Sequence, residues 1–186
     1  MSEELFPAPR RPRRVVTAVK DGRSGVVSDG PIPNALHHQA TPGMMSSIVY
    51  RTASQPQLTD GTEETAPERG PLVPAPGGTT LLFVKFPPDS VYQLPGFDPV
   101  ASAEESAGFA PDFAATFEPD SPGFHNTSTI DYDIVVDGEI WLELDEETVH
   151  LVDGDVAIQH GTRHAWRNKG DRPATMAFVL IGPAVD

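Results

Sequence analysis

The sequence predicts an all-β fold in which short strands, joined by tight turns, close into a compact antiparallel barrel. The chain has 186 residues, the size of one ordinary domain. Its 20 Pro and 16 Gly are too many for a helix bundle. Short runs rich in β-branched and aromatic residues follow one another between turn residues, which is typical of a sandwich or barrel. We therefore expect a single domain over residues 1–186.

The N-terminal part, residues 1–96, is expected to hold strands and loops. The runs 15–20 and 25–28 flank Asp21-Gly22, which predicts a β-hairpin. Further strands are expected at 46–52 and 79–86.

Two loops are expected between these strands. Residues 55–78 are poor in large apolar side chains and rich in Pro, Gly, Thr and Glu, which predicts an exposed loop. His37 and His38 lie between Pro33 and Pro42 without a strand or helix pattern, so a surface loop is expected there as well.

A helical segment is expected within residues 97–120, around 99–117. Ser102 and Glu105 have the spacing of a capping box. Three phenylalanines spaced four residues apart share one helix face: Phe109, Phe113 and Phe117. They can seat the segment on the core, or the segment can form a lid over a pocket mouth. The two roles are compatible, because a lid must also pack.

The strand signal is strongest in the C-terminal third of the chain. Alternating residues at 125–136 meet Asp137-Gly138, a two-residue turn, and the chain returns at 139–144. Four more short strands complete the series, at 148–152, 155–159, 164–168 and 174–181. So many strands joined by tight turns predict a compact antiparallel barrel.

The charge of the chain argues against some partners. There are 27 acidic and 13 basic residues, a formal net charge of −14, which disfavours nucleic acid and anionic membranes. No Lys or Arg occurs between Lys85 and Arg163, although 17 acidic residues do. The chain has no cysteine, no secretory hydrophobic segment and no apolar run near 20 residues. We expect a cytoplasmic protein whose metal ligands, if any, are His or carboxylate.

One face of the barrel interior is expected to carry polar side chains. Alternate residues of a strand share a face, which groups His125, Thr127, Thr129 and Asp131. On a later strand His164, Trp166 and Asn168 share a face and can meet them. By the same parity, Tyr132, Arg163 and Arg167 are expected to point outward.

The spacings His125-x-Thr127-x3-Asp131-x6-Gly138 and Gly154-x4-Gln159-x-Gly161-x2-His164-x3-Asn168 resemble the two cupin motifs. The resemblance covers residues 123–182, and this part of the sequence is similar to small bacterial single-domain cupins. It implies a double-stranded β-helix, or jelly roll, across the chain. Thr127 stands where the motif has a second His, Asp131 replaces Glu and Gln159 replaces Pro.

The resemblance implies roles for individual residues. His125, Asp131 and His164 would be the catalytic residues and would hold a divalent metal (Fe, Mn, Ni or Zn), with no organic cofactor. Substrate contacts would come from five further residues: Thr127, Thr129, Gln159, Trp166 and Asn168. It also implies a homodimer, for which we expect the strands within 15–28 to form the contact.

Three functions remain open from the sequence. The first is a metal-dependent enzyme acting on a small organic molecule inside the barrel. The second is a metal-free lyase, isomerase or dehydratase of secondary metabolism that uses a His–Asp pair as acid and base. The third is a non-catalytic protein that binds a small ligand.

Overall fold

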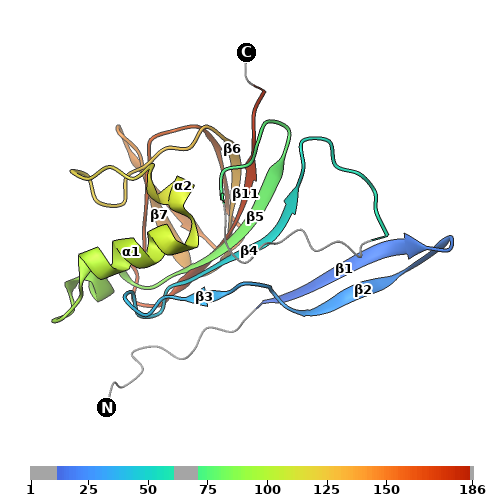
Figure 1. Ribbon diagram of the computed structural model, residues 1–186. Coiled ribbons are helices and arrows are strands. Elements are labelled where there is room, and N and C mark those ends of the chain that lie inside the picture. The colour runs from blue at the N-terminus through green and yellow to red at the C-terminus, as the bar shows by residue number, and fades with distance from the viewer. Residues whose placement is uncertain (1–11, 61–70, 185–186) are drawn as a thin grey trace.

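The computed structural model describes residues 12–60 and 71–184 and consists mainly of β-strands (Figure 1). A two-stranded, a three-stranded and a six-stranded sheet account for the strands. The all-β prediction is therefore confirmed. Among these residues, no helix is both long and apolar enough to span a membrane.

The strands follow the predicted order closely. Their bounds are β1 Arg13–Lys20, β2 Arg23–Pro31, β3 Leu36–His37, β4 Met45–Thr52, β5 Thr79–Phe86, β6 Ile130–Asp137, β7 Glu139–Glu143, β8 Thr148–Val152, β9 Val156–His160, β10 Ala165–Arg167 and β11 Ala174–Ile181. The strand predicted from residue 125 begins only at Ile130, and β3 was not predicted.

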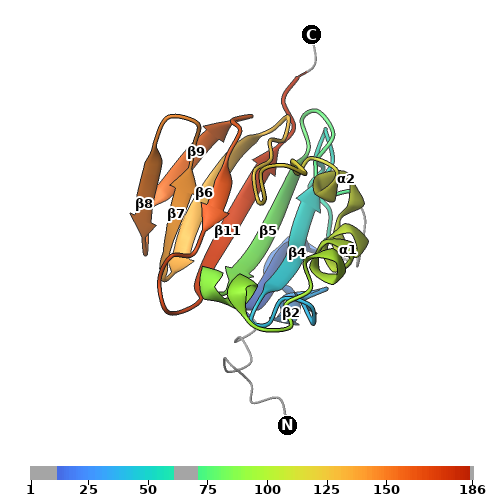
Figure 2. The same cartoon turned by 90° about the vertical axis from the view of Figure 1, so that its left-hand side faces the viewer.

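The barrel is built from two sheets that enclose a common core. The larger sheet has the order β3-β4-β5-β11-β6-β9, and the smaller has the order β10-β7-β8 (Figure 2). Side chains from both sheets, such as Ile48 and Met176 on the larger and Ile140 and Leu142 on the smaller, form one buried cluster. Buried positions alternate along β6, so Asp131, Asp133 and Val135 point into this interior.

Two short α-helices, α1 (Pro99–Phe109) and α2 (Pro111–Ala114), lie beside β4 and β5, as Figure 2 shows. A 3₁₀-helix at Asp89–Gln93 precedes them. The capping box expected at Ser102 is wrong: the helix begins earlier, and the N-cap Asp98 accepts hydrogen bonds from the backbone N–H of Val100 and Ala101. Pro99 sets the start, because its missing N–H is not needed in the first turn.

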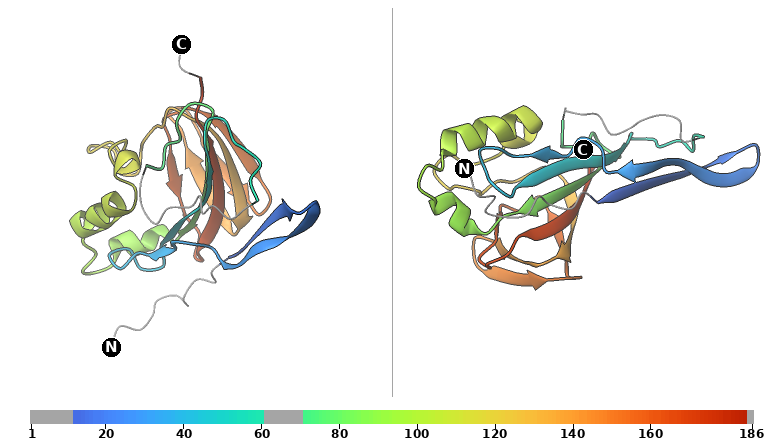
Figure 3. Two further views of the ribbon diagram at one scale, coloured as in Figure 1. Left: turned by 45° about the vertical axis from the view of Figure 1, so that its right-hand side comes forward. Right: turned by 90° about the horizontal axis from the view of Figure 1, so that it is seen from below.

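The predicted N-terminal hairpin is present and stands apart from the barrel. β1 and β2 pair only with each other among the described strands, across the Asp21-Gly22 turn. Both turn residues have positive φ, 52° and 74°, which suits a two-residue hairpin turn. Figures 1 and 3 show the hairpin projecting away from the barrel.

Two expected surface loops are partly buried. Leu72, within the predicted exposed loop 55–78, is fully buried, and its backbone N–H donates to Asp112 of α2. Residues 61–70 of that loop lie outside the described residues. His38 is also buried, so the expectation of a surface histidine pair is wrong there. Burial of both residues depends on the α1–α2 segment, which the local sequence around them does not encode.

Candidate functional site

The core of the candidate site is a pair of histidines that the backbone holds side by side. His125 donates its backbone N–H to the carbonyl of His164, and His164 donates to the carbonyl of His125, each over 3.0 Å. This reciprocal antiparallel bridge brings the two imidazole centroids to 4.3 Å. The meeting of His125 and His164 that the sequence predicted is thus formed, although neither residue lies within a regular strand.

Both imidazoles are held in the same tautomer. Nδ1 of His125 lies 3.1 Å from the carbonyl of Gly123, and Nδ1 of His164 lies 2.9 Å from the carbonyl of Thr162. A carbonyl oxygen can only accept, so each Nδ1 carries the proton. The Nε2 atom of each neutral ring therefore keeps a lone pair, as a general base or a metal ligand requires.

Gln159 of β9 connects His164 to a second buried acid. Its amide nitrogen donates to Oδ2 of Asp133 over 2.7 Å and lies 3.2 Å from Nε2 of His164. Its amide oxygen accepts a hydrogen bond of 2.7 Å from the hydroxyl of Thr162, which fixes the orientation of the amide. Gln159 therefore positions the imidazole and the carboxyl relative to each other.

Sequence reasoning missed Asp133. It lies two residues after Asp131 on β6, on the same inward face, and is fully buried. Strand alternation could have identified Asp133 from the sequence, because residues two apart on a strand share a face, which places the carboxyls of Asp131 and Asp133 together. We use the term interior polar cluster for His125, Thr127, Thr129, Asp131, Asp133, Gln159 and His164, all of which are buried.

Burial shifts the proton affinities of this cluster. It raises the pKa of Asp133 from 3.8 to about 7, an effect that the Gln159 hydrogen bond opposes and the neighbouring Asp131 reinforces. It lowers the pKa of His125 from 6.5 to about 4, with His164 adding to the effect. Burial also lowers the pKa of His164. Near neutral pH the cluster thus combines two uncharged imidazoles with a carboxyl that is partly protonated.

Asp131 lies in the interior, but its hydrogen bonds are with Thr127 and Thr129 and not with the histidines. Burial raises its pKa, while hydrogen bonds from the hydroxyls of Thr129 and Thr127 lower it. These two hydroxyls lie 2.7 Å apart, which brings the predicted Thr127 and Thr129 into the cluster. One carboxyl oxygen of Asp131 has no hydrogen-bond partner among the described residues.

The three predicted metal ligands do not form a ligand set in this structure. Within residues 12–60 and 71–184, no group of three or more His, Cys, Asp or Glu side chains is arranged to hold a metal ion. Two imidazoles lie together, but the arrangement lacks the third protein ligand that an open-sided catalytic metal site usually has. The residues therefore do not fit a three-ligand metal centre as placed.

Aromatic side chains cover the cluster on the side of His125. Phe117 stacks on the His125 ring at 4.5 Å between centroids, and Phe113 meets it edge-on at 4.9 Å. The ring centroids of Trp166 and His164 are 5.8 Å apart, which agrees with the prediction that the two side chains share one face. The expected single helix face of three phenylalanines is not formed, because α1 ends at Phe109 and α2 at Ala114. Phe109 lies in the core, Phe113 packs against the core and against His125, and Phe117, beyond both helices, stacks on His125.

Two arginines fasten the segment that carries Phe117. Arg163 binds both carboxylate oxygens of Glu118 at 2.6 Å and one of Asp145 at 2.6 Å, and its guanidinium lies 4.1 Å from the Phe124 ring centre. Arg167 donates to the carbonyl of Pro122 and to Glu143. Both arginines point away from the interior, as predicted, and they hold residues 118–124 against the barrel.

Asn168 does not join the interior polar cluster. Its amide nitrogen donates to the carbonyls of Phe86 and Arg172, and its oxygen accepts from the N–H of Gly170. Its side chain thus orders the turn between β10 and β11.

A cavity of about 300 Å³ lies away from the interior polar cluster. It is lined by residues such as Arg51 and Thr80, and none of the cluster residues lines it.

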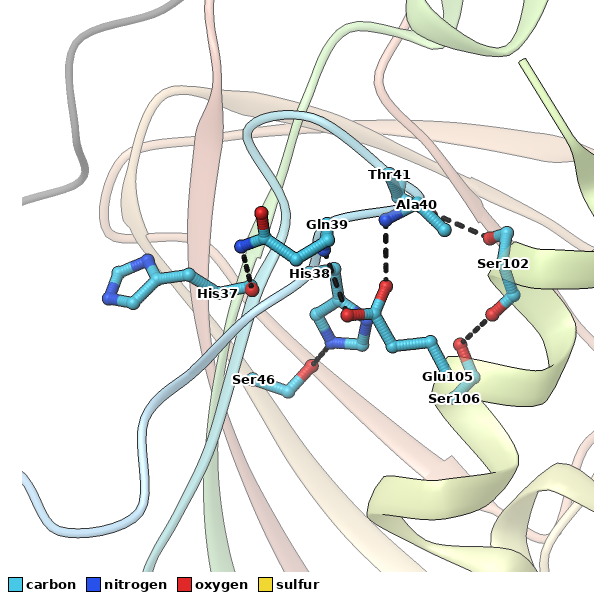
Figure 4. Close-up of polar contacts among 9 residues, drawn as sticks. All are labelled: His37, His38, Gln39, Ala40, Thr41, Ser46, Ser102, Glu105 and Ser106. Carbon is cyan, nitrogen blue, oxygen red and sulfur yellow. Dashed lines mark hydrogen bonds and ion pairs between the residues drawn. The ribbon is translucent and has the colours of Figure 1, made fainter.

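A third buried histidine, His38, lies in a different setting (Figure 4). Nε2 of His38 is 3.0 Å from the hydroxyl of Ser46, and Nδ1 is 3.7 Å from Glu105 of α1. Glu105 accepts the backbone N–H of Gln39 at 2.8 Å and of Ala40 at 2.9 Å. We call these five residues the helix-anchor cluster, because Glu105 ties α1 to the chain after β3.

Comparison with known proteins supports a cupin domain. Residues 114–181 match the Cupin_2 family, described as a cupin domain. Three similar curated proteins are fungal: phomopsin biosynthesis cluster protein D of Diaporthe leptostromiformis (56% identity over 59 residues), oryzines biosynthesis cluster protein J of Aspergillus oryzae (46% over 60) and the cupin-domain-containing oxidoreductase virC of Hypocrea virens (38% over 61). These matches cover 31%, 32% and 31% of this chain and 31%, 34% and 31% of the relatives, about a third of their length.

Solved cupin structures are similar at low identity. One is the Cupin_2 domain of an XRE family transcriptional regulator from Enterobacter cloacae, with 14% identity, a TM-score of 0.35 and coverage of 57% of this chain and 83% of that chain. Another is an RmlC-like cupin family protein with a double-stranded β-helix fold from Methanocaldococcus jannaschii, with 13% identity, a TM-score of 0.36 and coverage of 55% and 69%.

Proposed function

Because the chain belongs to the cupin superfamily through its domain at residues 114–181, we propose that it is an enzyme that acts on a small organic molecule held against the interior polar cluster. The observation that carries the proposal is the Gln159 amide, which joins Nε2 of His164 to the carboxyl of Asp133. A neutral imidazole and a partly protonated carboxyl, held at fixed positions, are suited to act as base and acid on one substrate.

The proposed chemistry is a proton transfer. Nε2 of His164 takes a proton from one substrate atom, which replaces the long 3.2 Å contact from Gln159. Asp133, in its protonated form, delivers a proton to another atom of the same molecule. Isomerisation, dehydration and cyclisation all follow this pattern, and none needs a redox partner.

The substrate is proposed to be uncharged or cationic. The stretch between Lys85 and Arg163 supplies β6 to β9 and contains no cationic side chain to bind a phosphate or carboxylate. Relatives named for phomopsin and oryzines biosynthesis clusters support a place in secondary metabolism. Phe113 and Phe117 would move aside to admit the substrate and return to exclude water.

Exchange of substrate hydrogen for solvent deuterium tests this proposal. Small neutral hydroxy and carbonyl compounds are first selected by thermal shift against the full chain and then incubated with it in D₂O. Mass spectrometry should show deuterium incorporation with the wild type and with His150→Ala, an exposed histidine on β8, but not with His164→Ala. A ligand that binds tightly and is recovered without deuterium or any other change would instead support the non-catalytic function.

A metal-dependent enzyme is the second candidate. The lone pairs on Nε2 of the adjacent His125 and His164 favour it, as does the relative named as a cupin-domain-containing oxidoreductase. Elemental analysis of protein purified without chelator separates the candidates. Stoichiometric Fe, Mn, Ni or Zn, lost together with activity on chelation, would favour the metal, whereas activity that persists in chelator supports the acid–base reaction.

A further inference from the structure

The β1–β2 hairpin (Arg13–Lys20 and Arg23–Pro31) presents an uncovered apolar face. Val15, Val19 and Val26 are 45%, 62% and 61% exposed. They share one side of the hairpin, because Val15 and Val19 alternate along β1 and Val26 pairs with the intervening Thr17. A two-stranded hairpin is at best marginally stable in water by itself, so a projecting one needs a surface to pack against.

A second apolar surface lies on the outer face of the larger sheet. Tyr132 of β6 and Ile158 of β9 are register partners and are 43% and 53% exposed, and Val156 is 53% exposed. The inner face of the same two strands carries Asp133 and Gln159 of the interior polar cluster. The hairpin of the same chain points away from the barrel, as Figure 3 shows, and the exposed fractions of these side chains show that it does not cover them.

The charges of the two surfaces are complementary. The hairpin carries four basic residues (Arg13, Arg14, Lys20 and Arg23) against two acidic ones (Asp21 and Asp29). Residues 130–160, which form β6 to β9, contain no Lys or Arg. The exposed acids nearest the outer face of β6 and β9 are Asp137, at the end of β6, and Asp153 and Asp155, at the β8–β9 turn. Opposite charges around two apolar patches favour their association.

We propose that the hairpin of one chain docks on the outer face of β6 and β9 of a second copy, and that the second hairpin docks reciprocally. This forms a two-fold symmetric dimer in which the same two surfaces meet twice. The contact covers the valine face of each hairpin and braces the strands that carry Asp133 and Gln159. The expectation of a dimer through residues 15–28 did not say which surface of the second copy the hairpin contacts. The proposal names that surface as the outer face of β6 and β9.

Sedimentation velocity on the full chain and three variants tests the proposal. The wild type should be a dimer at micromolar concentration, as should Val100→Asp, which places the same charge on an exposed valine of α1. Val19→Asp on the hairpin and Ile158→Asp on the sheet should each raise the dissociation constant about 100-fold or more. Unchanged melting temperatures of dilute monomers would show that the variants fold.

Mixing the two variants distinguishes this dimer from others. A pair of one Val19→Asp and one Ile158→Asp chain retains one of the two symmetric contacts, because the intact hairpin meets the intact sheet. The mixture should therefore form more dimer than either variant alone. A monomeric wild type, a fully dimeric Ile158→Asp variant or a mixture with no added dimer would each overturn the proposal, since the two surfaces would then serve different partners.

Discussion

The interior polar cluster and the helix-anchor cluster each place a buried histidine near a carboxyl, but their hydrogen bonding differs. In the helix-anchor cluster, both oxygens of Glu105 accept backbone N–H groups, and Nδ1 of His38 lies 3.7 Å from one of them. In the interior polar cluster, one oxygen of Asp133 has no hydrogen-bond partner within the described part of the chain, and the other shares the Gln159 amide with His164. The first arrangement fastens a helix, whereas the second leaves groups free to exchange protons.

The largest expected difference between the clusters is in catalysis. His164→Ala should reduce deuterium incorporation into substrate about 10²- to 10⁴-fold, because it removes the proposed base. His38→Ala should leave that rate near the wild-type value, since its imidazole contacts Ser46 and, on α1, Glu105 and Phe109. The rates are compared at equal concentrations of folded protein, and equal losses in both variants would contradict the separation of roles.

The next largest effect is on the pH dependence of the free energy of unfolding, to which Asp133 and His125 contribute with opposite signs. Its carboxyl keeps its proton up to about pH 7 in the folded chain but loses it near pH 3.8 when unfolded. The contribution to stability is therefore present below pH 3.8 and is lost as pH rises through 7, by up to about 4 kcal/mol. His125 has the opposite sign: its contribution is present above pH 6.5 and is lost as pH falls to about 4, by about 3 kcal/mol.

The contributions of Asp133 and His125 to the free energy of unfolding change in opposite directions with pH and should nearly cancel each other between pH 4 and 6.5, the window set by the two pKa shifts. Asp133→Asn should then gain stability as pH rises through this window, and His125→Gln should lose it. Urea unfolding at several pH values measures the free energy of unfolding. Parallel pH profiles for the two variants would show that neither group is buried as described.

A smaller effect is expected from the carboxylate of the helix-anchor cluster. Glu105→Ala leaves the N–H groups of Gln39 and Ala40 without their acceptor, which should lower the free energy of unfolding by about 1–3 kcal/mol. Glu104→Ala, at the exposed neighbouring position, is the matched control and should change stability little. Deuterium incorporation into substrate should be unchanged in both variants, and a selective loss in Glu105→Ala would give this cluster a role in the reaction.

The smallest effect concerns the cover over His125. Arg163→Gln removes the paired hydrogen bonds to Glu118, so residues 113–124 should exchange amide hydrogen about fivefold faster. Arg172→Gln, which loses a single 3.5 Å contact with Asp137, is the control. Mass spectrometry measures the exchange. If residues 113–124 exchange equally fast in both variants, Arg163 does not hold this segment.

The sequence predicts strands better than it predicts which polar side chains become buried. The β11 bounds and the hairpin follow from alternation and turn residues, which are local properties. The meeting of His125 with His164 follows from strand alternation, which places both side chains on faces that point into the barrel. Burial of His38 depends on α1 packing over it, and the orientation of Asn168 depends in part on the carbonyl of Phe86, which is distant in the sequence. Such contacts are set by tertiary structure and leave no periodic signal.

Nitrogen NMR of the histidine side chains tests the central claim most directly. In chelator-treated protein at pH 7, the account predicts that His125 and His164 are both neutral, with the proton on Nδ1 and a bare Nε2. Asp133→Asn should leave these tautomers in place, because the Gly123 and Thr162 carbonyls fix them. A charged imidazole at His164, or a proton on its Nε2, would contradict the account, since that ring could not then accept a proton from a substrate.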